Sequence, residues 1–271
     1  MVLALHGFND YSNGFDGMAK TFSQHAITSY AIDQRGFGTT SQRGLWAGLD
    51  VMQADLLLTA DLLCKRHPDL PLFLLGESMG GAVIISAAEA LENSCIQGVV
   101  LSAPAVWGWQ SMPWWQGLIL RMVAHTLPAY TLTGEGLDIK PSDNIEMLRA
   151  LGRDPLVIKR TRIDTIYGLT NLMEDAQVNS AKLHLPALLL YGEHDEIIPP
   201  QATCLMIRQL SPSQENWDMV LYPEGYHMLI RDLQGKVVIR DIIAWLHDRN
   251  ASFPSGNEVA PDQPRLAQLC K

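Results

Sequence analysis

A Gly-x-Ser-x-Gly pattern at residues 76–80 constrains the fold of this chain more than any other stretch. The apolar run 71–75 before it predicts a short buried strand, and residues 82–92 after it have the composition and spacing of a helix. A serine on a strained turn between a strand and a helix is typical of a nucleophile elbow, where glycines prevent collisions with the flanking backbone. The start of a helix also favours negative charge that develops beside it. We therefore predict that Ser78 is a nucleophile.

The rest of the chain alternates between apolar strands and helices, which is typical of a mostly parallel sheet covered by helices on both faces. We expect strands at residues 2–5, 29–33, 71–75, 97–102, 187–191 and 217–222, and helices at 15–25, 49–66, 82–92, 201–210 and 237–249.

The alternation is interrupted once. Residues 105–182 give mainly helical patterns and no convincing strand, so we expect a helical cap inserted after the strand that follows the nucleophile helix. The core then comprises residues 1–104 and 183–250. Prolines and a glycine predict a flexible tail over residues 251–271.

Charge and composition exclude several classes of protein. The net charge of −9 argues against a nucleic-acid partner, which requires a basic surface. No apolar run reaches the ~20 residues that span a bilayer. The chain lacks a signal peptide and opens directly in an expected strand, which predicts a cytoplasmic protein, although a removed leader would leave no trace. The four cysteines have no metal-binding spacing, and we expect thiols rather than disulfides at Cys64, Cys95, Cys204 and Cys270.

A serine hydroxyl needs a base to take its proton and a third group to orient that base. In a sheet of this type the partners follow in the order serine, acid, histidine. Asp195 comes directly after an expected strand, where active-site loops of such sheets gather, and Glu193 is the reserve candidate. His227 is the histidine that lies in a loop after the last expected strand and follows Asp195 in the chain. We predict Asp195 as the acid and His227 as the base.

Two backbone N–H groups are expected to bind the oxyanion of the reaction. One belongs to Met79, the residue after the nucleophile. The other should come from the loop after the first strand, where Phe8 follows His6 and Gly7.

Taken together, these motifs resemble the α/β-hydrolase fold, and within it the monoacylglycerol lipase and lysophospholipase-like group. The matching stretches are residues 6–7, 33–38, 76–81, 192–195 and, in the cap, 154–157. The resemblance implies Ser78, Asp195 and His227 as the catalytic triad, Phe8 and Met79 as oxyanion donors, and neither a metal nor an organic cofactor. The chain departs from the group in lacking the antiparallel strands that usually precede the His-Gly strand, which leaves its sheet edge and oligomeric state open.

The substrate class depends on the cap, where tryptophans cluster beside other apolar residues. An apolar lid suits the acyl chain of a small ester, and its rim suits transient contact with a lipid surface. Packing of the cap onto the sheet explains the same residues equally well. The tentative pocket residues are Trp46, Trp107, Trp109, Trp114 and Trp115.

Monoacylglycerols, lysophospholipids and short-to-medium acyl esters are the substrates that the sequence favours. An amidase, aminopeptidase or lactonase on the same fold is an alternative, as is a non-catalytic binding protein. An aminopeptidase would hold the substrate amine with acidic cap residues, for which the candidates are Glu135, Asp138, Asp143, Glu146, Asp164, Glu174 and Asp175.

Overall fold

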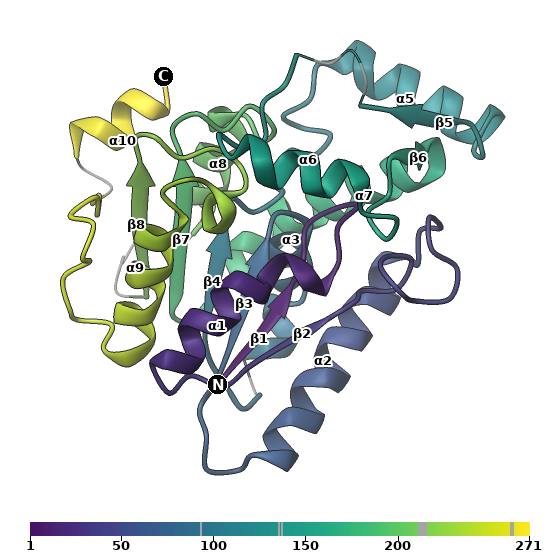
Figure 1. The fold of residues 1–271 in the computed structure, drawn as a ribbon. Coiled ribbons are helices and arrows are strands. Elements are labelled where there is room, and N and C mark those ends of the chain that lie inside the picture. The colour runs from purple at the N-terminus through teal and green to yellow at the C-terminus, as the bar shows by residue number, and fades with distance from the viewer. Residues whose placement is uncertain (93, 135, 137, 211–215, 261–262) are drawn as a thin grey trace.

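A computed structural model of the chain describes residues 1–92, 94–134, 136, 138–210, 216–260 and 263–271. Its centre is a six-stranded sheet in the order β2-β1-β3-β4-β7-β8, and every neighbouring pair of these strands is parallel (Figure 1). The strands are β1 (Val2–Leu5), β2 (Ser29–Ile32), β3 (Leu72–Glu77), β4 (Ile96–Ser102), β7 (Ala187–Gly192) and β8 (Trp217–Tyr222). The predicted α/β class with a parallel sheet is confirmed.

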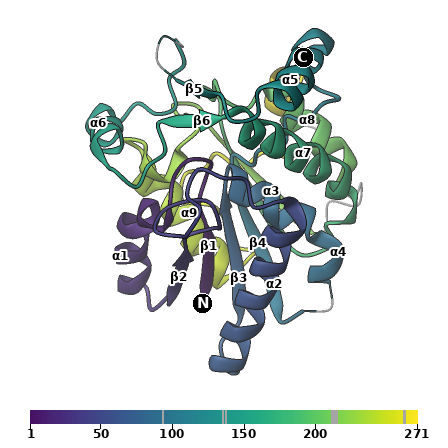
Figure 2. The same ribbon diagram turned by 90° about the vertical axis from the view of Figure 1, so that its right-hand side faces the viewer.

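Helices cover both faces of this sheet because successive residues of each strand point to opposite sides. Leu3 and Leu5 of β1 belong to a core shared with α2 (Leu49–Arg66), α3 (Met79–Ser86) and α8 (Pro200–Gln209). Val2 and Ala4 belong to a second core, shared with α1 (Asp16–Gln24) and α9 (Gly235–His247). Figure 2 shows α1 and α9 on one side of the sheet and α2 and α3 on the other. Short helical turns accompany these layers at η1 (Ser12–Phe15), α4 (Ala88–Leu91) and η3 (Leu229–Arg231).

The insert after β4 forms a cap beyond the carboxyl ends of the strands (Figure 1). It contains α5 (Trp114–Thr126), β5 (Thr131–Thr133), α6 (Ile145–Arg153), β6 (Arg160–Arg162), α7 (Ile163–Asn179) and η2 (Ser180–Lys182). The expectation that it holds no strand is wrong, because β5 and β6 pair antiparallel. Each is three residues long and pairs with a distant segment, so neither produces a periodic pattern in the sequence.

The last helix of the cap is built into the core. Leu172, Met173 and Ala176 of α7 are buried in the same cluster as the residues of α3. The insert is therefore fixed to the nucleophile helix along one of its sides.

Two disulfides overturn the expectation of thiols. Cys64 of α2 bonds to Cys95, which directly precedes β4, and Cys204 of α8 bonds to Cys270 near the end of the chain. The partners are 31 and 66 residues apart in sequence, so only the tertiary fold brings them together. Scattered cysteines without a short spacing carry no signal of such pairing.

The end of the chain runs along the outer strand of the sheet. Leu221 N donates to Asn257 O over 3.0 Å, and Val259 N donates to Met219 O over 2.9 Å. α10 (Pro264–Leu269) follows and is bonded covalently to α8 through Cys270. The described part of the expected tail is thus paired with β8 and packed on the core. Among the described residues, none of the helices combines the length and apolar character needed to cross a membrane.

Candidate active site

Ser78 stands at the turn between β3 and α3 that the sequence predicts. Its φ of 51° and ψ of −114° are strained for a residue with a side chain, and this is the conformation expected of a nucleophile elbow. The neighbouring backbone holds this conformation. Ser78 N donates to Ser102 O over 2.9 Å, and Ala105 N donates to Ser78 O over 3.0 Å. The nucleophile candidate is therefore fixed by β4 as well as by its own strand.

Close backbone approach explains two glycines of the turn. A Cβ atom on Gly80 would lie 2.1 Å from the carbonyl oxygen of Leu5, and one on Gly76 would lie 2.4 Å from the backbone nitrogen of Gly81. Both distances are far below van der Waals contact, and the obstructing atoms are backbone that cannot rotate away. A side chain at either position would therefore force the strand or the helix to move.

His227 and Asp195 form a buried pair after the last two strands. Asp195 Oδ2 accepts a hydrogen bond from His227 Nδ1 at 2.8 Å. The other carboxylate oxygen accepts from the backbone N–H groups of Ile197 and Ile198, at 2.8 and 3.0 Å. Because the carboxylate holds the proton on Nδ1, Nε2 is left free to act as a base. Glu193, the reserve candidate, lies instead 2.7 Å from Arg265.

The charges around His227 change its pKa in opposite directions. Burial alone lowers the pKa of the imidazole, because the charged form loses solvation. The Asp195 carboxylate outweighs that effect, with a further contribution from Glu77, while Arg231 opposes them. The net result is a pKa raised above the ordinary value of histidine. This environment makes the imidazole a stronger base than an isolated histidine.

A cavity of about 240 Å³ brings the nucleophile and the base together. Both Ser78 and His227 line it, as does Phe8, whose N–H the sequence predicts as an oxyanion donor. Gly7 lies beside the nucleophile, since a Cβ built on it would be in ordinary van der Waals contact, 3.4 Å, with Ser78 Cβ. Met79, the other predicted donor, is the first residue of α3. The structure thus gathers the predicted residues at one place on the carboxyl edge of the sheet.

His6 has a structural position rather than a place in the cavity. Its ring is fully buried, and its Nε2 accepts from Gln34 N at 3.0 Å while Nδ1 lies 2.8 Å from Gly7 O. Burial lowers the pKa of this imidazole, so the ring is neutral and links the loops after β1 and β2.

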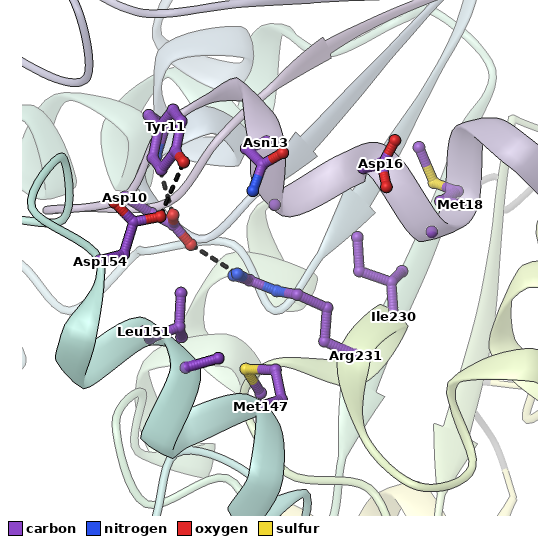
Figure 3. A pocket seen from close by; sticks show the side chains of 13 residues that line it. Asp10, Tyr11, Asn13, Asp16, Met18, Met147, Leu151, Asp154, Ile230 and Arg231 are labelled. Carbon is purple, nitrogen blue, oxygen red and sulfur yellow. Dashed lines mark hydrogen bonds and ion pairs between the residues drawn. The ribbon is translucent and has the colours of Figure 1, made fainter.

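An ion cluster that the sequence analysis did not identify borders the same cavity. The Arg231 guanidinium lies 2.6 Å from Asp10 and 2.9 Å from Glu77, and all three side chains are nearly buried. Burial alone would lower the pKa of Arg231, but the two carboxylates outweigh it and raise that pKa. The sequence features that could have indicated this cluster are the glutamate directly before the nucleophile serine and the arginine four residues after His227. Figure 3 shows the Asp10–Arg231 pair from the side of a neighbouring pocket.

The cap is tied to the loop that carries His227. Met228 N donates to Pro141 O over 3.0 Å, and the buried Ser142 hydroxyl donates to Asp232 over 2.6 Å. Asn144 Nδ2 donates to Arg231 O over 2.9 Å. These bonds hold the histidine loop from the cap side.

Of the five tryptophans proposed for the pocket, three pack against other parts of the protein and two are exposed on α5. Trp46 packs so closely on α7 that a Cβ on Gly168 would lie 2.4 Å from its ring. Trp109 donates to Asn171 over 2.9 Å, and Trp107 packs against the core. Trp114 and Trp115 lie on α5 and are 78% and 50% exposed. None of the five is among the described residues that line the cavity at Ser78, so their contribution to a substrate pocket stays a prediction.

The sheet, the elbow and the cap define an α/β-hydrolase. The family described as serine aminopeptidase, S33, matches residues 1–234, and the chain belongs to that family. Within the described residues, no group of three or more His, Cys, Asp or Glu side chains is placed to hold a metal ion.

Relatives with established names are similar to most of the chain. The monoglyceride lipase of Mus musculus is 29% identical over 263 residues, which cover 94% of this chain and 85% of that protein. The monoacylglycerol lipase of Mycolicibacterium smegmatis is 24% identical, with 91% and 87% covered. The crystal structure of the Paleococcus ferrophilus monoacylglycerol lipase has a TM-score of 0.75 at 25% identity, with 90% of this chain and 93% of that chain covered.

Proposed function

We propose that this chain is a serine hydrolase that cleaves small carboxylic esters, with monoacylglycerols as the favoured class. The observation that carries the proposal is the buried His227–Asp195 pair on the same cavity as the strained Ser78. The names of the relatives support the ester class.

In this mechanism Ser78 Oγ attacks the ester carbonyl and His227 Nε2 takes its proton. The N–H groups of Phe8 and Met79 stabilise the oxyanion of the tetrahedral intermediate. His227 then protonates the leaving alcohol, and an acyl-enzyme remains on Ser78. A water molecule activated by the same imidazole hydrolyses that ester. Asp195 keeps the imidazole in the required tautomer and stabilises its charged form.

Labelling and turnover test the nucleophile. We expect a fluorophosphonate probe to label the wild type and a burst of p-nitrophenol from a p-nitrophenyl ester. Ser78→Ala should lose both, with turnover reduced about 10⁴-fold or more. Ser23→Ala, at an exposed serine of α1, is the control and should behave like the wild type. Near-normal turnover in Ser78→Ala would overturn the proposal, and a folded wild type that resists the probe would favour the non-catalytic binding protein.

An aminopeptidase is the second candidate, because the family description carries that activity. It would need free acidic side chains in the cap to hold a substrate amine. Asp164 instead pairs with Arg162, Asp143 accepts from Leu233 N, and Glu174 accepts from Gln110 N. Glu135 lies outside the described residues. Rates on p-nitrophenyl esters against aminoacyl anilides decide between the two classes, and we expect the esters to be preferred.

We also infer that α5 is the part of the cap that contacts a lipid surface. None of its residues is buried, and Trp114, Leu118 and Met122 are 78%, 59% and 58% exposed. An exposed apolar face on a helix gains free energy when it enters a lipid interface. Leu118→Gln should weaken co-sedimentation with phosphatidylcholine vesicles. Leu58→Gln, at an equally exposed leucine of α2 (58%), is the matched control and should not. Equal binding by both variants would contradict the assignment to α5.

A further inference from the structure

The loop between β1 and η1 adopts a conformation that needs support. Asn9, directly after Phe8, has a φ of 65°, in the left-handed region. Asp10 N donates to Gly7 O over 3.3 Å, so residues 7–10 form a turn with Phe8 and Asn9 at its centre. Asparagine tolerates this region better than most residues, but the conformation is still less favourable than its alternatives. The direction of the Phe8 N–H depends on this turn.

Two contacts from the cap hold Asn9 in place. Ile158 N donates to the backbone oxygen of Asn9 over 2.9 Å. Asn9 Nδ2 donates to the hydroxyl of Thr161 over 2.7 Å, and Thr161 is buried. Main chain and side chain of the same residue are therefore bound by one stretch of the cap, which lies between α6 and α7.

A third contact fixes the far end of the turn. Tyr11 OH donates to Asp154 Oδ2 over 2.7 Å, as Figure 3 shows. The other oxygen of Asp154 accepts from Leu156 N over 2.8 Å, which orients the carboxylate. The hydrogen bond to Asp154 raises the pKa of Tyr11 to about 12, so the phenol remains the donor over any working pH. This contact gives a role to the Asp154–Val157 stretch, which the sequence analysis names as a matching stretch without a function.

We propose that the cap segment 154–161 positions the oxyanion loop, residues 6–11, and that Asn9 is the positioning residue that joins the two. The inference rests on the proposed function, in which the Phe8 N–H binds the oxyanion. Oxyanion donors stabilise a transition state only if they are already oriented before the reaction. On one side of Phe8, Gly7 O lies 2.8 Å from His6 Nδ1 and accepts from Asp10 N, and on the other side the cap holds Asn9. A cap variant can thus slow the chemistry without contacting the substrate.

The test removes one contact at a time. Thr161→Val deletes the hydroxyl at constant size, and Asn9→Gly keeps the left-handed backbone while it removes the amide. We expect each variant to lower kcat on p-nitrophenyl butyrate by about tenfold. This loss is smaller than the ~10²–10³-fold loss caused by complete removal of an oxyanion donor. KM should stay within about twofold of the wild-type value, because ground-state binding is unchanged. Thr161→Ser should restore kcat. Thr126→Val makes the same change on exposed α5 and is the matched control.

An oxyanion-specific readout separates positioning from stability. Ser78 Oγ adds to the carbonyl carbon of a butyl trifluoromethyl ketone, the hydroxyl proton passes to His227, and the resulting hemiketal oxyanion lies against the donors. The affinity for the ketone should fall by the same factor as kcat in Thr161→Val and Asn9→Gly. Unchanged kcat in both folded variants would overturn the inference, as would a loss of kcat with unchanged ketone affinity. Either result leaves Ser78 essential, whereas failure of the proposed function would appear as turnover by Ser78→Ala.

Discussion

At the scale of single residues, the base depends on two carboxylates rather than one. Asp195 contacts His227 directly, and Glu77 acts on it through space from the position before the nucleophile. Glu77 is itself buried against Arg231, at 2.9 Å. Burial raises the pKa of Glu77, and the Glu77 carboxylate in its charged form raises the pKa of the base.

The pH dependence of turnover should report this second carboxylate. The reaction requires neutral His227, so kcat/KM falls as pH drops through its pKa, which the structure places above the ordinary histidine value. Glu77→Gln removes a charge that raises this pKa. We therefore expect the acidic limb of the kcat/KM profile to move to lower pH, so that the variant keeps relatively more activity in mild acid. The profile measured with a p-nitrophenyl ester checks this.

Glu89→Gln provides the control for that shift, because Glu89 is an exposed residue paired with Lys182. Its profile should overlay that of the wild type. If the acidic limb of the Glu77→Gln profile stays in place or moves to higher pH, Glu77 does not raise the pKa of His227.

At the scale of elements, the parts predictable from sequence are those determined by neighbours in the chain. The strand, Ser78 and the helix after it form one continuous stretch, so their pattern is visible without a structure. Asp195 and His227 can be predicted because each lies in a loop after an expected strand and they follow Ser78 in the chain order acid, then histidine. The sequence does not indicate the roles of Arg231, Asn9 and Thr161, because their partners are distant in the chain. Arg231 and Glu77 are 154 residues apart, and Asn9 and Thr161 are 152 residues apart. No local spacing indicates such pairs.

The tight packing of the elbow on β1 gives an element-scale prediction. Gly80→Ala would place a methyl group 2.1 Å from Leu5 O, so strand or helix must move. We expect the free energy of unfolding to fall by about 1–3 kcal/mol, measured by urea denaturation. Gly17→Ala in α1 meets nothing within 4 Å and should be neutral or stabilising by up to about 1 kcal/mol. Similar values for the two variants would mean that the close approach at Gly80 does not limit stability.

At the scale of the whole molecule, the chain end closes the side of the sheet formed by β8. The backbone bonds to Asn257 and Val259 occupy groups that an edge strand otherwise leaves unpaired. The Cys204–Cys270 bond then anchors α10 to α8. Disulfides persist in oxidising compartments and are rare in the cytosol. Maintenance of this bond therefore requires an oxidising environment, and we expect the native protein to show no free thiols at these positions. The cytoplasmic location expected from the sequence stays a prediction.

The anchoring bond should stabilise the fold without serving the chemistry. Cys204 and Cys270 are 66 residues apart, so the bond restricts a long loop in the unfolded chain. Cys270→Ser should lower the free energy of unfolding by about 2–5 kcal/mol and expose residues 251–260 to limited proteolysis, while labelling of Ser78 persists. Cys95→Ser, which opens the other disulfide, should lose stability without exposing the chain end. If Cys270→Ser had the same free energy of unfolding in urea and the same resistance to protease as the wild type, backbone pairing with β8 alone would hold the chain end.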